Sequence, residues 1–373
     1  MARKKAELNE DIETLEASID KLTASLKKSK VVGLPDLELF DATRLETNTS
    51  GLSTGSPAVD VMLKRPIPVG IHELFGPYGS GKTTMALHIC ANAQKKGLPT
   101  FYINLERALN KEVLACISGL DSSKLRIINP VTGNQATEFA LDVFRTIQSP
   151  VVILDSVAGC AATENVHDKS MSEQTMGELG KLMSVFLAKA VPLVDDSGGR
   201  LILINQVRDK LNMYVAGHTS PGGRGLEHWT TQRLMFSGGL SKTSYIEEGS
   251  KDDSKDDSKD SPKNGSKKSS KNGSTKYIGK KIDVTAIKNR LGFPLMEAEM
   301  FIYFGRGIWK EKEIVKLATE LGVVDKGGSW YSYKGENIAQ GEDKLFEHIR
   351  NTNGLYDEIK SKVYELTGLS NEI

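Results

Sequence analysis

The sequence predicts an α/β protein with a mostly parallel central sheet that helices cover on both faces. Short, nearly continuous apolar runs end in polar residues, as in FYINLE, VVILD and LILINQ. Such runs are typical of strands in a parallel sheet that is buried on both sides. Helical spacing follows the strand IHELF and its glycine-rich loop, in TMALHICANAQ. The polar residues at the strand ends should therefore meet at the edge where such sheets bind ligands.

The composition is that of a globular protein without a protein-wide charge. Of 373 residues, 39% are hydrophobic and 26% are charged, which suits one large domain with one or two small ones. The net charge of +1 excludes a general attraction to nucleic acid, so a nucleic-acid site must be local. Scattered cysteines, a charged N-terminus and the lack of a membrane-length apolar run predict a cytoplasmic protein.

The chain is predicted to have three parts. Residues 1–50 hold a helix and a linker, and the apolar seam of the helix is expected to pack on its own domain or on a neighbouring subunit. Residues 51–305 form the core. Within the core, residues 247–276 contain the repeat KDDSKDDSKD and the run KNGSKKSSKNGS, which cannot build a hydrophobic core, so this insertion is predicted to be disordered. Residues 306–373 form a small C-terminal α/β domain.

Short segments near the end of the core and in the C-terminal part carry their own predictions. KKIDVTAIKNR and EAEMFIYF should form a strand pair. We expect a helix near residues 312–321, a hairpin around GGSWYSYKGENIAQG, and a last helix from about Leu355.

A glycine-rich loop with one lysine and one hydroxyl predicts a site for a phosphate chain. GPYGSGKTT carries the complete pattern Gly-x4-Gly-Lys-Thr between a strand and a helix. Glycines let backbone N–H groups approach phosphate oxygens at the helix N-terminus. Lys82 should reach the β- and γ-phosphates, and Thr83 should bind Mg²⁺. The predicted phosphate loop consists of Gly76, Pro77, Tyr78, Gly79, Ser80, Gly81, Lys82, Thr83 and Thr84.

Three polar residues at the ends of apolar runs are candidates for catalysis. Asp155 ends VVILD and should hold the Mg²⁺ water shell, although a strand-end aspartate can also cap the next segment. Glu106 ends FYINLE and is placed to orient or deprotonate water, although it could be a surface glutamate. Gln206 ends LILINQ, where its amide can contact the γ-phosphate. A loop rich in glycine and basic residues follows it, which is the arrangement of a switch.

These residues resemble the bacterial RecA recombinase family in order and spacing, from about residue 51 to residue 369. The resemblance rests on the segments STGSPAVDVML, ELFGPYGSGKTT, INLERALN, VVILDSVA, LILINQVR, PGGRGLEHW, AIKNRLGFP and WYSYKGENIAQG. The last is the most specific, because generic ATPases with this phosphate loop lack such a C-terminal hairpin. The resemblance leaves open whether the chain is bacterial or encoded by a phage.

The resemblance implies an ATP-dependent filament on single-stranded DNA that performs homologous pairing and strand exchange with double-stranded DNA. ATP and Mg²⁺ are the implied cofactors, and single-strand-binding and loader proteins are the implied partners. Lys288 and Arg290 match the basic pair that reaches the γ-phosphate of the adjacent subunit. A positive charge supplied in trans can increase phosphoryl transfer about 10³- to 10⁵-fold. Without the resemblance, both residues could be ordinary surface bases.

The resemblance places DNA contacts in two loops, at about residues 159–175 and 207–225. Basic side chains there should meet phosphates, glycines should let backbone amides approach them, and Leu211 could wedge between bases. Met176 could act as a second wedge or fill the core. The candidates are Met176, Lys181, Arg208, Lys210, Leu211, Gly222, Gly223 and Arg224.

The sequence departs from the family pattern at several positions. Val113 stands where an aromatic residue usually stacks on adenine, so Phe304 is expected to help hold the base. His228 replaces an aromatic residue at the subunit interface, and the insertion is longer than usual. The acidic tail of the family is absent after TGLSNEI, from which we expect easier access to duplex DNA.

Two other functions share this core. A hexameric helicase would have the same phosphate loop, strand-end aspartate and trans-acting bases, but WYSYKGENIAQG argues against it. A non-exchanging mediator ATPase of recombination would often lack Glu106 or the basic pair, and this chain retains both. Closed rings would identify the helicase, and ATPase activity without DNA stimulation would identify the mediator.

Overall fold

The computed structural model describes residues 51–161, 177–209, 218–219, 221–238, 241–247 and 276–369. The chain divides into two compact units, Met1–Thr49 and Ser50–Ile373. The predicted N-terminal helix and nearly all of the predicted insertion lie outside the described residues. Glu247, the first residue assigned to that insertion, instead ends strand β9 (Tyr245–Glu247), because it pairs with Tyr277.

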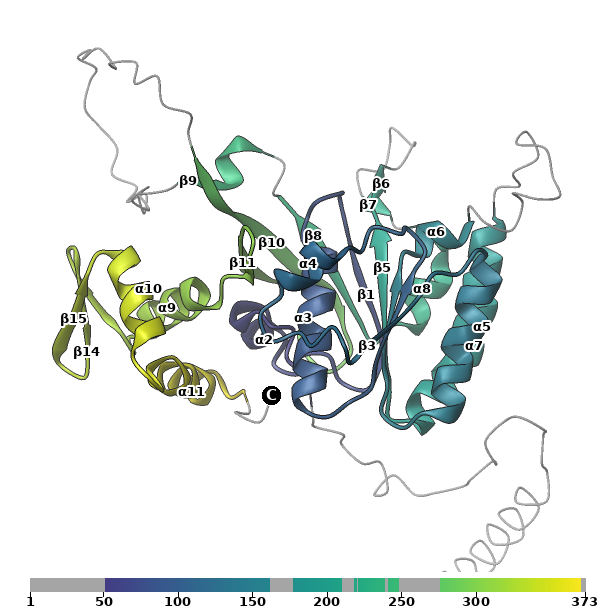
Figure 1. Ribbon diagram of the computed structural model, residues 1–373, viewed down its shortest axis with the longest axis horizontal. Coiled ribbons are helices and arrows are strands. Elements are labelled where there is room, and N and C mark those ends of the chain that lie inside the picture. Colours follow the sequence, from purple (N-terminus) through teal and green to yellow (C-terminus); the bar gives the residue numbers. More distant parts are fainter. Residues whose placement is uncertain are drawn as a thin grey trace, which may run out of the picture. The chain divides into compact units, whose positions relative to one another are not determined.

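The central sheet has the order β12-β11-β10-β8-β1-β5-β4-β2-β3, with β9 paired to β10 (Figure 1). Every pairing from β8 to β3 is parallel, and β10 pairs antiparallel with β8, β9 and β11. The mostly parallel sheet predicted from the sequence is therefore confirmed. The parallel strands are β1 (Gly70–Gly76), β2 (Thr100–Asn104), β3 (Leu125–Ile128), β4 (Val151–Asp155), β5 (Arg200–Gln206) and β8 (Gln232–Ser237).

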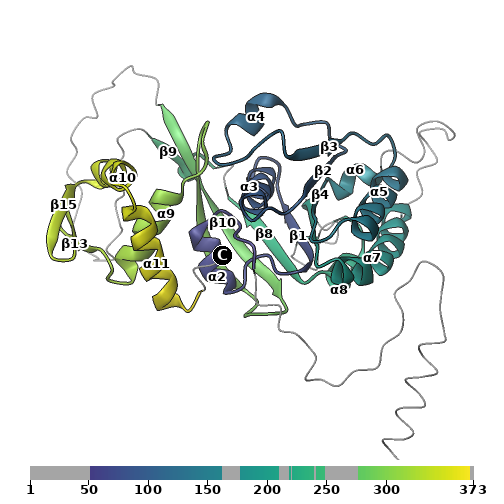
Figure 2. The same cartoon turned by 60° about the horizontal axis from the view of Figure 1, so that its bottom comes forward.

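Alternate residues of the parallel strands belong to two separate apolar cores. Leu74 and Ile204 pack with helix α3 (Lys82–Lys95) on one face. Leu203 packs on the other face with α5 (Gly133–Thr146), α7 (Glu178–Asp196) and α8 (Arg224–Trp229). Figure 2 shows α3 on one side of the sheet and α7 with α8 on the other. Both faces are covered, which explains the nearly continuous apolar runs.

Strands β10 (Tyr277–Asn289) and β11 (Met296–Tyr303) form the predicted pair, and β12 (Gly307–Ile308) extends it. Strand β8, which joins this pair to the parallel strands, was not predicted. Its sequence QRLMFS begins with two polar residues, Gln232 and Arg233, and both are buried. Shorter elements complete this part of the chain: α2 (Pro57–Leu63), α4 (Lys111–Ala115), α6 (Val157–Ala161), β6 (Arg208–Asp209), β7 (His218–Thr219) and the 3₁₀ helix η2 (Lys242–Ser244).

The C-terminal residues form a helix, a small sheet and two more helices around their own apolar cluster. The predicted first helix is α9 (Lys310–Glu320), and the predicted hairpin is β14 (Trp330–Tyr333) with β15 (Glu336–Gln340), next to β13 (Asp325–Gly327). The last helix, α11 (Leu355–Thr367), begins at the predicted residue. Helix α10 (Glu342–Asn351) was missed. The boundary predicted between residues 305 and 306 stays a prediction.

A buried carboxylate on α9 attaches this C-terminal part to the core. Glu313 accepts hydrogen bonds at Oε2 from Ser56 Oγ at 2.6 Å and from the Ala58 amide at 3.2 Å. At Oε1 it accepts the amide of Phe301 on β11 at 2.9 Å. One side chain thus holds the start of α2, strand β11 and helix α9 together.

The cysteines differ in burial, and the described helices are not of the membrane-spanning kind. Cys90 and Cys160 are buried thiols, and Cys116 is half-buried. Within the described part of the chain, no helix has both the length and the apolar character needed to cross a bilayer.

Replacing Glu313 should destabilise the protein strongly. Glu313→Ala leaves three buried donors without an acceptor and should lower the free energy of unfolding by about 2–4 kcal/mol. Glu313→Gln, which keeps one acceptor oxygen, should cost less. Chemical denaturation checks this against Glu320→Ala, an exposed change on the same helix. Equal losses for Glu313→Ala and Glu320→Ala would contradict the role of Glu313.

Candidate nucleotide and DNA site

The phosphate loop (residues 76–84) joins β1 to α3 and depends on its glycines. A Cβ on Gly76 would lie 2.3 Å from the carbonyl oxygen of Phe236 on β8, so only glycine fits. Gly79 and Gly81 have φ angles of +69° and +89°, which favour glycine. Gly81 is also the residue before the first turn of α3. The loop therefore presents backbone amides at a helix N-terminus, as an anion site requires.

Lys82 lies inside the loop rather than pointing to solvent. Its Nζ donates to the carbonyls of Gly76 at 3.0 Å and Pro77 at 2.6 Å. Burial lowers the pKa of Lys82 to about 8, and the nearby carboxylates of Asp155 and Glu106 oppose that shift. A phosphate chain in the loop would add negative charge next to this ammonium group and stabilise its charged form.

Asp155 and Thr83 form an oxygen site suited to Mg²⁺. Thr83 Oγ1 lies 3.3 Å from Asp155 Oδ2, across the ends of α3 and β4. The buried hydroxyl of Tyr102 on β2 also donates to Asp155 Oδ2. Burial raises the pKa of Asp155, and the two hydroxyl donors oppose this shift. Carboxylate and hydroxyl oxygens are ligands that Mg²⁺ prefers, usually together with water and phosphate oxygens, so the residues fit this ion.

The structure brings Glu106 and Gln206 into direct contact. Gln206 Nε2 donates to Glu106 Oε1 at 3.2 Å, and Ser156 Oγ donates to the same oxygen. The amides of Leu105 and Glu106 both bond to the carbonyl of Asp155, which holds the chain after β2 at the end of the neighbouring strand β4. Both side chains are exposed at the carboxyl edge of the sheet, as a group that orients water must be.

Gln206 also adjoins the phosphate loop and the second predicted DNA loop. The amide of Val207 bonds to the carbonyl of Gly76 at 3.3 Å. Asn205 Oδ1 accepts the Gln206 amide at 3.0 Å, and Asn205 Nδ2 donates to the carbonyl of Pro221 at 2.7 Å. Asn205 is buried, so this contact fixes the position of Pro221, directly before Gly222.

A buried ion pair continues from Asn205 toward α8. Asn205 Nδ2 donates to Glu73 Oε1 at 2.9 Å, and Arg233 Nε donates to Glu73 Oε2 at 2.6 Å. Arg233 Nη1 lies 3.6 Å from Glu227 on α8. Removing one member of a buried charge pair is costly, so this network should hold β1, β5, β8 and α8 in one arrangement.

Lys288 and Arg290 lie at the end of α8 rather than at the phosphate loop of their own chain. Lys288 Nζ donates to the carbonyls of Glu227 at 2.6 Å and His228 at 3.0 Å, and Arg290 Nη2 donates to that of His228 at 2.5 Å. Burial lowers the pKa of Lys288 to about 8, and the charges of Arg290 and Arg233 lower it further. In the sheet, Lys288 lies opposite Arg233, and Arg233 lies opposite Glu73 on β1. Glu73 is three residues before Gly76, where the phosphate loop begins.

The described DNA candidates gather at the start of α7 and α8. Lys181 is exposed in the first turns of α7, and Arg224 is exposed at the start of α8. Gly222 and Gly223 have φ angles of +108° and +77°, and a Cβ on Gly223 would lie 3.4 Å from Cα of Gly180 on α7. Met176, Lys210, Leu211 and the side chain of Arg208 lie outside the described residues.

The residues expected near the base and the subunit interface are all accessible. Tyr78 is 87% exposed, so the loop does not hold it, and Phe304 is 40% exposed at the end of β11. Val113 is exposed on α4. The ring of His228 meets that of Trp229 edge-on, with 4.9 Å between the centroids.

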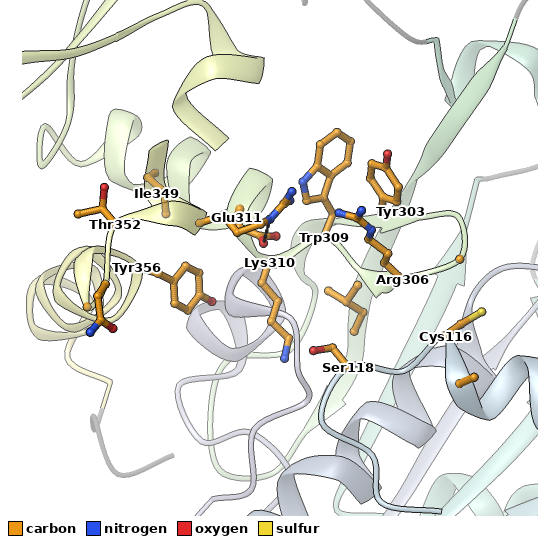
Figure 3. Close-up of a pocket in the computed structure, with 16 residues that line it drawn as sticks. Cys116, Ser118, Tyr303, Arg306, Trp309, Lys310, Glu311, Ile349, Thr352 and Tyr356 are labelled. Atoms are coloured by element: carbon orange, nitrogen blue, oxygen red, sulfur yellow. Dashed lines mark hydrogen bonds and ion pairs between the residues drawn. The ribbon is translucent and has the colours of Figure 1, made fainter. Parts of the chain in front are cut away.

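One pocket lies away from the phosphate loop (Figure 3). It has a volume of about 550 Å³ and lies between the residues after α4 and the C-terminal helices, with Arg306, Lys310 and Trp309 among its lining. None of the predicted catalytic or phosphate-loop residues lines it. This pocket is therefore separate from the candidate site formed by the phosphate loop and the nearby carboxylates.

Sequence reasoning missed several residues of the site. Tyr102 bonds to Asp155 and Ser156 bonds to Glu106. Asn205 connects Gln206 to Pro221, and Glu73 accepts a hydrogen bond from Asn205. Tyr102 and Glu73 lie within strands, where alternation alone gives no sign of a partner. Asn205 directly precedes Gln206, and a second amide at a strand end was a usable signal. Among the described residues, no cluster of three or more histidine, cysteine or acidic side chains suggests another metal site.

Two family models match the chain. The model described as "RecA N-terminal domain" matches residues 13–251, and the model described as "RecA C-terminal domain" matches residues 312–368.

Curated relatives match nearly the whole chain. A protein named "Protein RecA" from Aquifex aeolicus (strain VF5) is 33% identical over 97% of this chain and 95% of that relative. "Protein RecA" from Thermus aquaticus is 35% identical over 84% of each chain. "Protein RecA" from Heliobacterium modesticaldum (strain ATCC 51547 / Ice1) is 35% identical over 84% of this chain and 82% of that relative.

The low pKa of Lys82 should make nucleotide binding depend on pH. The free ammonium group loses its proton above about pH 8, and bound phosphates raise its pKa, so binding at pH 8.5 to 9.5 should take up a proton. Affinity for a magnesium–triphosphate should be flat below pH 8 and should fall above it. Calorimetry in two buffers of different ionisation enthalpy measures the proton uptake. Lys82→Arg, charged throughout, should show less uptake, and equal uptake would refute the assignment.

Proposed function

Because the chain belongs to the RecA family, we propose that the phosphate loop hydrolyses ATP within a helical assembly on single-stranded DNA. The chain is an ATP-dependent DNA recombinase, and its ATPase activity depends on DNA. The observation that carries the proposal is the 3.2 Å hydrogen bond from Gln206 Nε2 to Glu106 Oε1. It joins the candidate water-activating residue to the residue that precedes the candidate DNA loop.

The phosphate loop binds the triphosphate of ATP. Its amides and Lys82 bind the β- and γ-phosphates, and the ammonium group exchanges the carbonyls of Gly76 and Pro77 for phosphate oxygens. Thr83 and Asp155 hold Mg²⁺, which neutralises charge on the phosphates when it is bound. Tyr102 keeps the Asp155 carboxylate in place through its buried hydroxyl.

Glu106 orients and deprotonates the attacking water. Its Oε1 accepts hydrogen bonds from Ser156 and Gln206, which fix the carboxylate next to the loop. When ATP binds, Gln206 exchanges its hydrogen bond to Glu106 for one to the γ-phosphate. The bond to Glu106 forms again when the phosphate leaves. Because Asn205 is bonded to both the Gln206 amide and Pro221, a movement of Gln206 is passed to Pro221, the residue before Gly222 in the DNA loop.

The DNA loops bind the single strand mainly through phosphates. Lys181 and Arg224 are exposed near Gly223, whose exposed backbone can approach a phosphate. Gly222 is buried, and a Cβ there would lie 2.5 Å from Leu226 Cδ1, so it lets this turn pack on α8. Arg208, Lys210, Leu211 and Met176 complete the proposed surface. Binding should therefore weaken steeply with salt. Double-stranded DNA is the exchange partner.

The basic pair completes the active site of the neighbouring subunit. Lys288 and Arg290 bond to carbonyls at the end of α8, away from their own phosphate loop. Supplied in trans, their charges stabilise the transition state of phosphoryl transfer and make hydrolysis depend on assembly. Phe304 contacts the base of ATP at the other end of the site.

Single-strand-binding and loader proteins are the proposed partners. The filament must displace the single-strand-binding protein from DNA, and the loader proteins help to nucleate the filament. We place the protein's action at DNA in the cytoplasm, where recombination substrates lie. The helicase is not favoured, because a RecA C-terminal domain matches residues 312–368. The mediator is not favoured, because Glu106 and the basic pair are retained.

The proposal is tested by measuring ATP hydrolysis with and without single-stranded DNA, together with negative-stain images. We expect stimulation by DNA and open helical filaments. Closed rings, or an unchanged rate and no polymer, would refute it.

Glu106→Gln should separate nucleotide binding from turnover. The amide cannot deprotonate water, so hydrolysis should fall at least about 100-fold while ATP still binds. The variant should stay on single-stranded DNA in the extended state, which DNA retention during a chase with competitor DNA measures. Normal turnover would show that Glu106 does not activate water.

Mixing two inactive variants should restore hydrolysis if Lys288 acts in trans. Lys288→Ala alone should bind nucleotide but lose DNA-stimulated turnover. In a 1:1 mixture with Glu106→Gln, about a quarter of the interfaces combine an intact Glu106 with an intact Lys288 from the neighbour. We therefore expect about a quarter of the wild-type rate. A mixture as inactive as its components would mean that both residues act within one subunit.

A further inference from the structure

A row of side chains across β9, β10 and β11 extends from the phosphate loop. Lys280 on β10 lies directly opposite Tyr245 on β9 and Ile302 on β11. Directly opposed residues point to the same face of a sheet. A Cβ on Gly81 would lie 2.7 Å from Cδ1 of Ile302, so this face abuts the phosphate loop.

Lys280 makes direct contact with the loop. Its Nζ donates to the carbonyl of Gly79, although the two residues are 201 positions apart in the chain. Burial lowers the pKa of the Lys280 ammonium group. Its positive charge also contributes, after burial, to the lowered pKa of Lys82. The loop thus faces two neighbouring lysines, and a bound polyanion would relieve their repulsion.

Aromatic rings continue the row beyond Lys280. The centroid of the Tyr245 ring lies 6.1 Å from that of Phe304 and 5.3 Å from that of Tyr277. The rings are tilted by 60° and 53° to one another, and all three are partly exposed, so the cluster offers aromatic faces and edges beside Lys280. Val113, which stands where the family has an aromatic residue, offers no ring.

We propose that Lys280 is a second lysine that binds the phosphate chain of ATP in cis, and that Tyr245 and Phe304 form the surface on which the base stacks. This inference rests on the proposed function of the phosphate loop and adds Lys280 and Tyr245 to it. Lys280 moves from the Gly79 carbonyl to a phosphate oxygen as the nucleotide enters. Tyr245 supplies stacking area that Val113 lacks.

The pocket of Figure 3 is the competing place for the base. It shares the turn after β11, because Tyr303, Gly305 and Arg306 line it, but Phe304 and Lys280 do not. The cationic residues of this pocket, Arg306 and Lys310, do not belong to the row of Tyr245, Lys280 and Ile302 next to the phosphate loop. A base there would depend on Arg306 and not on Tyr245.

Binding of Mg–ATP and of Mg–tripolyphosphate, measured by calorimetry without DNA, tests the inference. Lys280→Gln retains a donor for the Gly79 carbonyl but removes the charge. It should weaken binding of both ligands about tenfold, and Lys280→Arg should bind nearly as wild type. Tyr245→Leu should weaken ATP about fivefold and leave tripolyphosphate unchanged, since only ATP carries a base.

Lys281→Gln is the matched control. Lys281 is the next residue on β10, its Nζ bonds to Glu299 Oε1 at 3.0 Å, and it alternates to the opposite face. It should bind both ligands as wild type does. The unfolding temperatures of all variants show whether the fold is kept.

The outcomes separate this inference from the proposed function. If wild type fails to bind Mg–ATP, the proposed function itself is wrong. If wild type binds and Lys280→Gln binds equally well, Lys280 only tethers the loop and the inference is overturned. If Arg306→Ala weakens ATP while Tyr245→Leu does not, the base lies in the pocket of Figure 3.

Discussion

One hydrogen bond, from Gln206 to Glu106, connects the two halves of the proposed chemistry. It joins the end of β5 to the segment after β2, across the intervening strand β4. Ser156 bonds to the same carboxylate oxygen, and Asn205 bonds to both the Gln206 amide and Pro221. Any change that moves Gln206 should therefore alter the proposed water-activating group and the Pro221 end of the proposed DNA loop together, which is the coupling a recombinase needs.

The sheet order makes this contact possible. Strands β1, β5, β4 and β2 are neighbours, and their carboxyl ends carry the phosphate loop, Gln206, Asp155 and Glu106. Parallel strands bring such ends to one edge whatever their distance in sequence. On the face away from α3, the Glu73–Arg233 pair joins these strands to α8, whose last carbonyls bind Lys288 and Arg290. The proposed nucleotide, DNA and subunit contacts would thus share one set of strands.

The sequence could predict which polar residues stand at the ends of strands, but not which residues of neighbouring strands contact one another. The glycine pattern and the final residues of apolar runs predicted that Lys82, Asp155, Glu106 and Gln206 lie at one edge of the sheet, and the structure brings Glu106 into contact with Gln206 there. Tyr102 and Lys280 were missed because their roles depend on strand order and register, which put them next to Asp155 and Gly79. Strand β8 was missed because its buried Gln232 and Arg233 interrupt the apolar pattern, and α10 because charged residues dominate its sequence, EDKLFEHIRN.

The most direct measurement of the coupling is the ratio of single-stranded DNA affinities with a non-hydrolysable ATP analogue and with ADP. The ratio should be large for wild type, because the γ-phosphate repositions Gln206. Gln206→Met, which has similar size but no amide, should bring the ratio close to one while nucleotide affinity is kept. A Gln206→Met variant with the full wild-type ratio would contradict the account.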